Sequence, residues 1–375
     1  MRAGVVLYTQ NPGDFERFAE RGSGPPPVPD SRAYDEELAL GELVEPLGFD
    51  SLWCVEHHFT PINLTPNALQ FLTFFAGRTR RIDFGTMVVV LPWHNPIRVA
   101  EEVSILDNLL EGRKLTIGVG RGAARREFDG LQIAMGESRD RFKEGLAFLR
   151  GALTNAQFTP EGQFYSGPQV EVRPRPRSSD LTDRMYLAGV SPETLQIAAD
   201  EDLGLLLLGQ KPWRDYPEDI ARYQAIRAEH GWGPRWPTIV LPVVCSESET
   251  DAEERAQRHF GEQQDSTTVH YEFGDAEHFR AAGNYQHYVR IAEAFERKGE
   301  DDVRRDAFKS QIWGTPEQCI EKIENVRTMT AAGELVMAFK FGKMTGEEAL
   351  ANMRLFASEV LPYVKAMPDE PTWEG

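Results

Sequence analysis

The chain of 375 residues carries 59 acidic and 41 basic residues, a formal net charge of −18. That charge repels polyanions and no Lys/Arg-rich run interrupts it, so we expect neither nucleic acid nor an anionic membrane as a partner. No apolar run approaches the roughly 20 residues that cross a bilayer, and the N-terminus lacks the pattern of a secretory signal. Three widely spaced cysteines, Cys54, Cys245 and Cys319, favour a reducing cytoplasm and no structural metal.

Strand-like and helix-like segments alternate along the chain. The apolar runs that predict strands are residues 3–8, 50–55, 82–91, 114–119, 184–190, 203–208, 238–244 and 334–341. Such runs are typical of parallel strands that are covered on both faces. Asn95, Ser191 and Thr315, each followed by proline, predict helix starts. Eight strands with intervening helices predict one (β/α)8 TIM barrel over residues 1–375, because the turn after the first strand lacks the GxGxxG motif of a doubly wound fold.

Two longer connections interrupt the alternation, residues 155–181 and the polar stretch 264–309. Long connections in a compact domain are often functional or mobile. The second connection joins the last two predicted strands. We therefore expect it to lie over the mouth of the barrel.

Three titratable residues, Glu56, His57 and His58, directly follow the second predicted strand. The carboxyl ends of barrel strands build the active site in this fold. Strand alternation sends His57 and His58 in different directions, so we expect one of them to face the barrel axis. A histidine here can also cap a loop and a glutamate can form a salt bridge, but the cluster favours acid/base chemistry.

Two further segments are suited to an anion. The run GVGRGAARREF places Arg121 between glycines after the fourth strand, and AGVSPET places Ser191 at a helix start after the fifth. Guanidinium groups and free helix N–H groups both bind phosphate, although exposed arginines and capped helices are also common. With the Glu-His-His cluster they predict a pocket for a phosphorylated cofactor. A metal is not expected, because the HExxH and HxH spacings are absent.

Several motifs resemble the bacterial luciferase-like flavin monooxygenases. They are EHHF, the block GTMVVVLPWHNPIRVAEEVSILDNLLEGR (residues 85–113), GVGRG and GESRDRF, and then GTPEQCIEKI and MRLFASEVLPYV, which are most similar to the luciferase α subunit. The resemblance extends over about residues 3–365. It implies a TIM barrel that binds reduced FMN, activates O2 as a flavin C4a-peroxide and oxygenates a substrate.

The resemblance also implies roles for single residues. His57 matches the catalytic histidine, and Glu56 matches its neighbour at the flavin site. Met87 and Val88 match a pair that packs on the isoalloxazine ring and is joined in the family by a non-prolyl cis peptide. The other matched positions contact the flavin or its phosphate, and they are Arg121, Gly122, Ala123, Arg139, Val190, Ser191 and Thr194.

Partners are implied in the same way. Because no nicotinamide fingerprint is visible, a separate NAD(P)H:flavin reductase would supply reduced FMN to this chain, which we expect to form a homodimer. Residues 264–309 stand where the family has a mobile active-site loop. The acidic surface and the aromatic residues favour a small, neutral, hydrophobic substrate. Three alternatives remain open: a deazaflavin-dependent hydride-transfer enzyme on the same fold, a non-catalytic flavin-binding relative, and a metal hydrolase.

Overall fold

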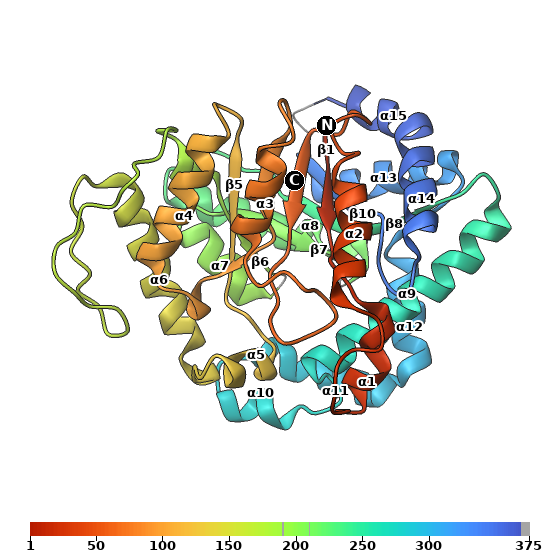
Figure 1. Ribbon diagram of the computed structural model, residues 1–375, viewed down its shortest axis with the longest axis horizontal. Helices are drawn as coiled ribbons and strands as arrows, with labels where there is room; N and C mark the ends of the chain where they lie inside the picture. Colours follow the sequence, from red (N-terminus) through yellow and green to blue (C-terminus); the bar gives the residue numbers. More distant parts are fainter. Residues whose placement is uncertain (190, 210, 369–375) are drawn as a thin grey trace.

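A computed structural model describes residues 1–189, 191–209 and 211–368. In this part of the chain, eight parallel strands close into a barrel (Figure 1). They are β1 (Arg2–Leu7), β2 (Ser51–Cys54), β3 (Asp83–Thr86), β5 (Leu115–Gly120), β6 (Met185–Ala188), β7 (Gly204–Leu208), β8 (Thr238–Cys245) and β10 (Glu334–Ala338). β10 pairs with both β8 and β1, which closes the cylinder. The predicted (β/α)8 barrel is confirmed.

The strand predicted over residues 82–91 is divided in two. β3 ends at Thr86, and β4 (Val89–Val90) continues the wall by pairing with β5. The division falls at Met87–Val88, whose peptide bond is cis although neither residue is proline. A further short strand, β9 (Ile312–Gly314), pairs with the end of β8.

One large ring fixes the register of the first three strands. Trp53 on β2 is buried, and its indole N–H donates to Ser51 Oγ at 2.8 Å. A Cβ on Gly4 or Gly85 would overlap the Ser51 hydroxyl or the Trp53 ring, so glycine on both neighbouring strands makes room for these side chains. Because the interior is close-packed in this way, the strand ends that carry the site are held in place.

Helices cover the outside of the barrel (Figure 1). They are α2 (Asp30–Gly41), α3 (Ala68–Ala76), α4 (Pro96–Leu109), α6 (Ser138–Thr154), α7 (Pro192–Asp200), α8 (Pro217–Glu229), α13 (Pro316–Thr330), α14 (Gly346–Glu359) and α15 (Leu361–Ala366). The three predicted helix starts are confirmed, since the side chains of Asn95, Ser191 and Thr315 cap α4, α7 and α13. No helix among the described residues is long and apolar enough to cross a membrane.

The two long connections take different forms. Residues 155–181 extend from the side of the barrel, and antiparallel bridges join Phe158 to Val170 and Glu161 to Ser166. Residues 264–309 are largely helical. They hold the end of α9 (Glu249–Tyr271) and then α10 (Glu277–Ala282), α11 (Gln286–Lys298) and α12 (Glu300–Lys309). With the short helices α1 (Phe15–Ala19) and α5 (Arg125–Gly130), these segments cover the carboxyl ends of the strands, at the bottom of Figure 1.

Candidate active site

One cavity of about 180 Å³ lies at the carboxyl ends of the strands. Ten of the eleven residues that the sequence singled out line it, and they are Glu56, His57, Met87, Val88, Arg121, Gly122, Ala123, Arg139, Ser191 and Thr194. The eleventh, Val190, lies outside the described residues. Segments spread over most of the barrel therefore meet at one place, as the strand-end argument predicts.

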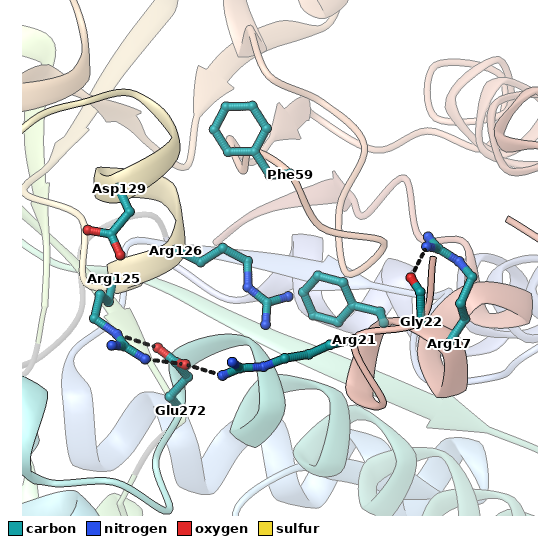
Figure 2. Close-up of a pocket in the computed structure, with 9 residues that line it drawn as sticks. Arg17, Arg21, Gly22, Phe59, Arg125, Arg126, Asp129 and Glu272 are labelled. Atoms are coloured by element: carbon teal, nitrogen blue, oxygen red, sulfur yellow. Dashed lines mark hydrogen bonds and ion pairs between the residues drawn. The ribbon is translucent and has the colours of Figure 1, made fainter. Parts of the chain in front are cut away.

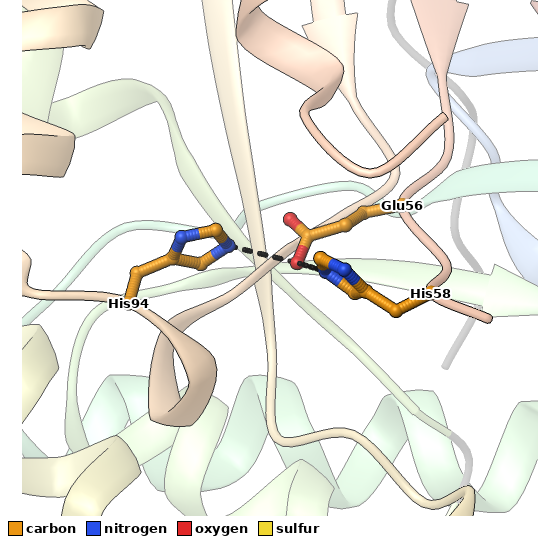
Figure 3. Close-up of side chains that lie close together, drawn as sticks. All are labelled: Glu56, His58 and His94. Atoms are coloured by element: carbon orange, nitrogen blue, oxygen red, sulfur yellow. Dashed lines mark hydrogen bonds and ion pairs between the residues drawn. The ribbon is translucent and has the colours of Figure 1, made fainter. Parts of the chain in front are cut away.

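Glu56 is a buried carboxylate between two histidines (Figure 3). Its Oε1 lies 2.8 Å from Nε2 of His94 and 3.3 Å from Nε2 of His58, and its Oε2 accepts the Val90 N–H at 3.3 Å. Burial alone would raise the pKa of Glu56, but the bonds from His58 and His94 outweigh burial and lower it. Glu56 is therefore ionised at neutral pH, and it fixes the ends of β2 and β4 relative to each other.

A second buried carboxylate, Glu127 on α5, contacts His57. His57 Nδ1 lies 3.0 Å from Glu127 Oε1, and the same oxygen accepts the His58 N–H at 2.7 Å. His270 on α9 lies behind them, with Nε2 3.5 Å from Glu127 Oε2. Burial alone would raise the pKa of Glu127, but the charges of His57 and His270 and the hydrogen bond to His57 hold that pKa at about 2. The site thus contains an oriented imidazole beside an ionised carboxylate.

Sequence reasoning missed Glu127, His94 and His270. Glu127 stands in the run GVGRGAARREF, where a single acid follows two arginines, but it is 70 positions from His57. His270 belongs to a stretch that looked uniformly polar, although its side chain is fully buried and burial lowers its pKa. The one available signal was chemical, because a catalytic histidine is commonly oriented by a carboxylate.

Two arginines converge on one backbone oxygen at the side of the cavity. Arg121 Nη1 and Arg139 Nη2 donate to the carbonyl of Asn284, at 2.8 and 3.0 Å. Arg139 also bonds to Glu193 at 2.6 Å, while its buried Nε has no partner among the described residues. The point where the two guanidinium groups meet is suited to an oxyanion.

The residue after Asn284 closes this side of the cavity. The Tyr285 ring lies 4.1 Å below the Arg121 guanidinium, and its hydroxyl donates to the Gly122 carbonyl at 2.9 Å and lies 2.8 Å from Ser138 Oγ. Asn284 and Tyr285 form the link between α10 and α11. The segment 264–309 therefore contributes directly to the wall of the site.

The helix start at α7 adds donors to the same side. Ser191 Oγ accepts the Thr194 N–H at 3.1 Å and lies 2.8 Å from the Thr194 hydroxyl. Gly189, at φ +150, precedes it, and a Cβ there would contact Thr194. Backbone N–H groups at such a helix start favour an anion.

Part of the cavity wall is apolar. Met87 and Val88 lie there, and a Cβ on Gly120 would overlap the Val88 side chain. Other apolar side chains of the lining are Val90, Trp93, Phe142, Leu187, Ile197 and Leu208. One cavity thus combines an anion clamp, an acid/base pair and an apolar surface.

The expectation of no metal stays a prediction. Glu56, His58 and His94 bring potential ligand atoms within 4.8 Å of one another, and His57, Glu127 and His270 do the same. Hydrogen bonds of His58 and His94 to Glu56 account for the short distances within the first group. In the second group, Glu127 Oε2 and both ring nitrogens of His270 make no hydrogen bond within the described chain.

A sequence model of the luciferase-like monooxygenases matches residues 1–333, and the chain belongs to this family. Among curated relatives, the alkanal monooxygenase alpha chain of Photorhabdus luminescens is 25% identical over 354 residues, which cover 91% of this chain and 95% of the relative. The corresponding chain of Photobacterium leiognathi is 27% identical over 350 residues, covering 91% and 96%. The resemblance seen in the motifs is confirmed.

Solved structures of low sequence identity share the fold. Monooxygenase RslO1 from Streptomyces bottropensis has a TM-score of 0.75 at 24% identity, covering 97% of this chain and 100% of that one. The oxygenating constituent of 3,6-diketocamphane monooxygenase from Pseudomonas putida, in complex with FMN, has a TM-score of 0.72 at 17% identity, covering 96% and 98%. A coenzyme F420-dependent tetrahydromethanopterin reductase from Methanopyrus kandleri has a TM-score of 0.64 at 16% identity, covering 96% and 99%.

Proposed function

We propose that this protein is a two-component monooxygenase that uses reduced FMN and O2 to oxygenate a small, hydrophobic organic substrate. The observation that carries the proposal is the convergence of Arg121 and Arg139 in the cavity that holds the His57–Glu127 pair. Membership of the luciferase-like family and similarity to an FMN complex support it. Reduced FMN would come from a separate NAD(P)H:flavin reductase.

The residues present fit FMN. Its phosphate would bind to Arg121 and Arg139 and to the start of α7 at Ser191 and Thr194, and the buried Nε of Arg139 is a donor that still lacks an acceptor. The isoalloxazine ring would pack on the apolar wall around Met87, Val88 and Gly120. A dry apolar wall is also what a reactive oxygen adduct requires.

A ligand can reach Arg121 and Arg139 only if residues 264–309 move. The cavity of about 180 Å³ is smaller than the roughly 300–1,000 Å³ that is usual for ligand sites. Asn284 and Tyr285 fill part of it and occupy the arginines. We infer that residues 264–309 act as a lid on a single barrel domain, with Gly283 at φ +77 as one position where the backbone can turn.

The protein's own residues would then have distinct tasks. Bound reduced flavin supplies the electrons that activate O2. Because an ionised Glu127 can only accept hydrogen bonds, a neutral His57 carries its proton on Nδ1 and leaves Nε2 to take up or return a proton in the cavity. Glu127 positions that ring, and the apolar wall excludes water.

A second candidate is a deazaflavin-dependent hydride-transfer enzyme. The specific support is the similarity to the F420-dependent reductase, which shares the fold at a TM-score of 0.64. The sequence relationship with alkanal monooxygenase alpha chains favours the first proposal. Consumption of O2 on addition of reduced FMN separates the two reactions.

The first experiment is an anaerobic titration with reduced FMN, followed by mixing with oxygenated buffer in a stopped-flow spectrometer. A slowly decaying flavin–oxygen adduct, with or without an added aldehyde or ketone, supports the monooxygenase. If reduced FMN does not bind and reduced F420 does, the second candidate replaces it. Light scattering on the same preparation tests the homodimer that we propose on family grounds.

A further inference from the structure

Figure 2 shows a second cleft, which is lined in part by α5 and by Glu272 at the end of α9. It has a volume of about 560 Å³, and its lining residues are Arg17, Phe18, Arg21, Gly22, Phe59, Arg125, Arg126, Asp129 and Glu272. Of the four arginines, Arg17 is held by Asp14 outside the lining, so three arginines remain against two acids, whereas acids outnumber bases by 59 to 41 in the whole chain. The local charge is therefore opposite in sign to the charge of the protein.

The acids of the cleft do not satisfy all of its arginines. Arg125 binds both oxygens of Glu272, at 2.7 and 2.9 Å, while Arg21 reaches Glu272 only at 3.5 Å and leaves 75% of its side chain exposed. The Arg126 side chain forms no hydrogen bond or ion pair with any described residue. Its guanidinium lies 4.0 Å over the Phe18 ring. Burial, together with the nearby charges of Arg21 and Arg125, lowers the pKa of Arg126 in spite of Glu272, so an incoming anion would relieve an unfavourable environment.

Three residues of the cleft have a left-handed backbone conformation. Arg21, Phe59 and Glu272 have φ of 54, 56 and 54°. At Arg21 and Glu272 this conformation ends α1 and α9, as is common at helix ends, whereas Phe59 lies in a loop, where it costs free energy for a residue with a Cβ. Strain at Phe59 holds an aromatic ring that is 56% exposed at the edge of the cleft.

The position of the Phe59 ring depends on glycine at residue 130. A Cβ on Gly130, at the end of α5, would overlap the Phe59 ring. Phe18, whose ring lies against the Arg126 guanidinium, gives the cleft a second aromatic side chain. Aromatic walls around free guanidinium groups suit a ligand with a flat apolar body and a negative charge.

We propose that this cleft binds a small organic anion, an oxyanion joined to an aromatic or apolar body, with Arg126 and Arg21 at the charge and Phe18 and Phe59 at the body. Its volume falls within the roughly 300–1,000 Å³ of small-molecule sites. The cleft is separate from the cavity that holds Arg121 and Arg139, and it shares no lining residue with that cavity. The oxyanion can be a carboxylate or a phosphate.

The two sites are nevertheless joined by short pieces of chain. Arg126 in the cleft precedes Glu127, which contacts His57, and Glu272 in the cleft follows His270 by two residues. A ligand that shifts α5 or the end of α9 would therefore reach the acid/base pair. This connection places the cleft where an anion can influence the proposed reaction.

Calorimetric titration of the full chain tests binding directly. The probes are 1-naphthyl phosphate, naphthalene-1-carboxylate, the neutral 1-naphthalenemethanol and inorganic phosphate. We expect at least one of the two aromatic anions to bind one per chain, roughly tenfold or more tighter than the neutral alcohol and inorganic phosphate, because a charge-assisted bond and an apolar contact are combined. The tighter of the two anions identifies the oxyanion. Binding of neither anion overturns the proposal.

Variants locate the bound probe. Arg126→Gln should weaken the aromatic anion by roughly tenfold, and Arg126→Lys, which keeps the charge but not the planar fork, should weaken it less. Arg98→Gln makes the same charge change on the exposed surface of α4 and should leave the affinity within about twofold. If Arg139→Gln removes binding and Arg126→Gln does not, the probe sits in the active-site cavity and the proposal is wrong. These outcomes do not depend on FMN or on turnover.

Discussion

His57 Nδ1 lies 3.0 Å from Glu127 Oε1, and the two residues are 70 positions apart in the chain. Their contact joins the end of β2 to α5, which follows β5. Glu127 also accepts the backbone N–H of His58, so one carboxylate fixes both the ring and the loop that carries it. An imidazole held in this way keeps one nitrogen for chemistry and the other for orientation.

Replacement of His57 by alanine tests its role as the acid/base group. His57→Ala should lower the turnover number with reduced FMN by roughly 10²–10⁴-fold, the usual contribution of a positioned acid/base residue. Affinity for reduced FMN should stay within a few-fold, because the clamp lies on Arg121 and Arg139. Product formation and anaerobic titration measure the two quantities. Unchanged turnover would remove His57 from the mechanism.

Glu127→Gln should change the acid dependence of stability. The pKa of Glu127 is about 2 in the folded protein, against an ordinary value of 4.5. Its ionised form therefore contributes stability that is fully present above pH 4.5 and is lost as the pH falls towards 2. Urea unfolding should show that the free energy of unfolding of the wild type, relative to Glu127→Gln, decreases between pH 5.5 and pH 3.5. Glu254→Gln, an exposed position on α9, is the matched control, and a constant difference for Glu127→Gln would contradict the assignment.

The arginine clamp is tested by charge removal on α6. Arg139→Gln should raise the dissociation constant for FMN by roughly ten- to a hundredfold, since a bond to a charged group contributes about 1.5–3 kcal/mol. Arg141→Gln lies two residues further along the same helix, where the arginine bonds to Glu137 outside the cavity. That control should bind FMN normally. Equal effects of the two changes would show only a general loss of positive charge.

The lid can be loosened without a change in the clamp. Tyr285→Phe removes the hydroxyl that donates to the Gly122 carbonyl and contacts Ser138 Oγ, but it keeps the ring beneath Arg121. If Asn284 and Tyr285 must leave before FMN enters, the association rate should rise by roughly fivefold, given about 1 kcal/mol for such a bond. Stopped-flow fluorescence of FMN measures that rate. Tyr363→Phe, an exposed residue of α15, should leave it unchanged, and a slower rate in Tyr285→Phe would argue against the lid.

The fold was accessible from sequence because its signals are local. Buried parallel strands appear as apolar runs, and Asn95, Ser191 and Thr315 mark helix starts by their own side chains. The single strand predicted over 82–91 is two strands, and the break between β3 and β4 falls at the cis bond between Met87 and Val88. A hydrophobicity pattern does not contain that bond, and only the family resemblance indicated it.

The site was accessible only in part. The residues at strand ends could be assembled because a barrel brings those ends together, whatever the length of chain between them. The pairing of His57 with Glu127 depends on how α5 packs, and sequence spacing carries no trace of it. The helices of 264–309 were also not evident, because much of the buried surface there is made by polar or aromatic residues such as His270 and Tyr285.

The carbonyl oxygen of Asn284 occupies the same arginine donors that a bound anion would use. It is covalently attached, so dilution does not weaken it, and its concentration at Arg121 and Arg139 is set by the fold. Any anion that uses these two residues binds with an apparent affinity reduced by the fraction of molecules in which the oxygen is in place. A weaker apparent affinity favours exchange of such a ligand with solvent, as the proposed supply of reduced FMN by a separate reductase would require.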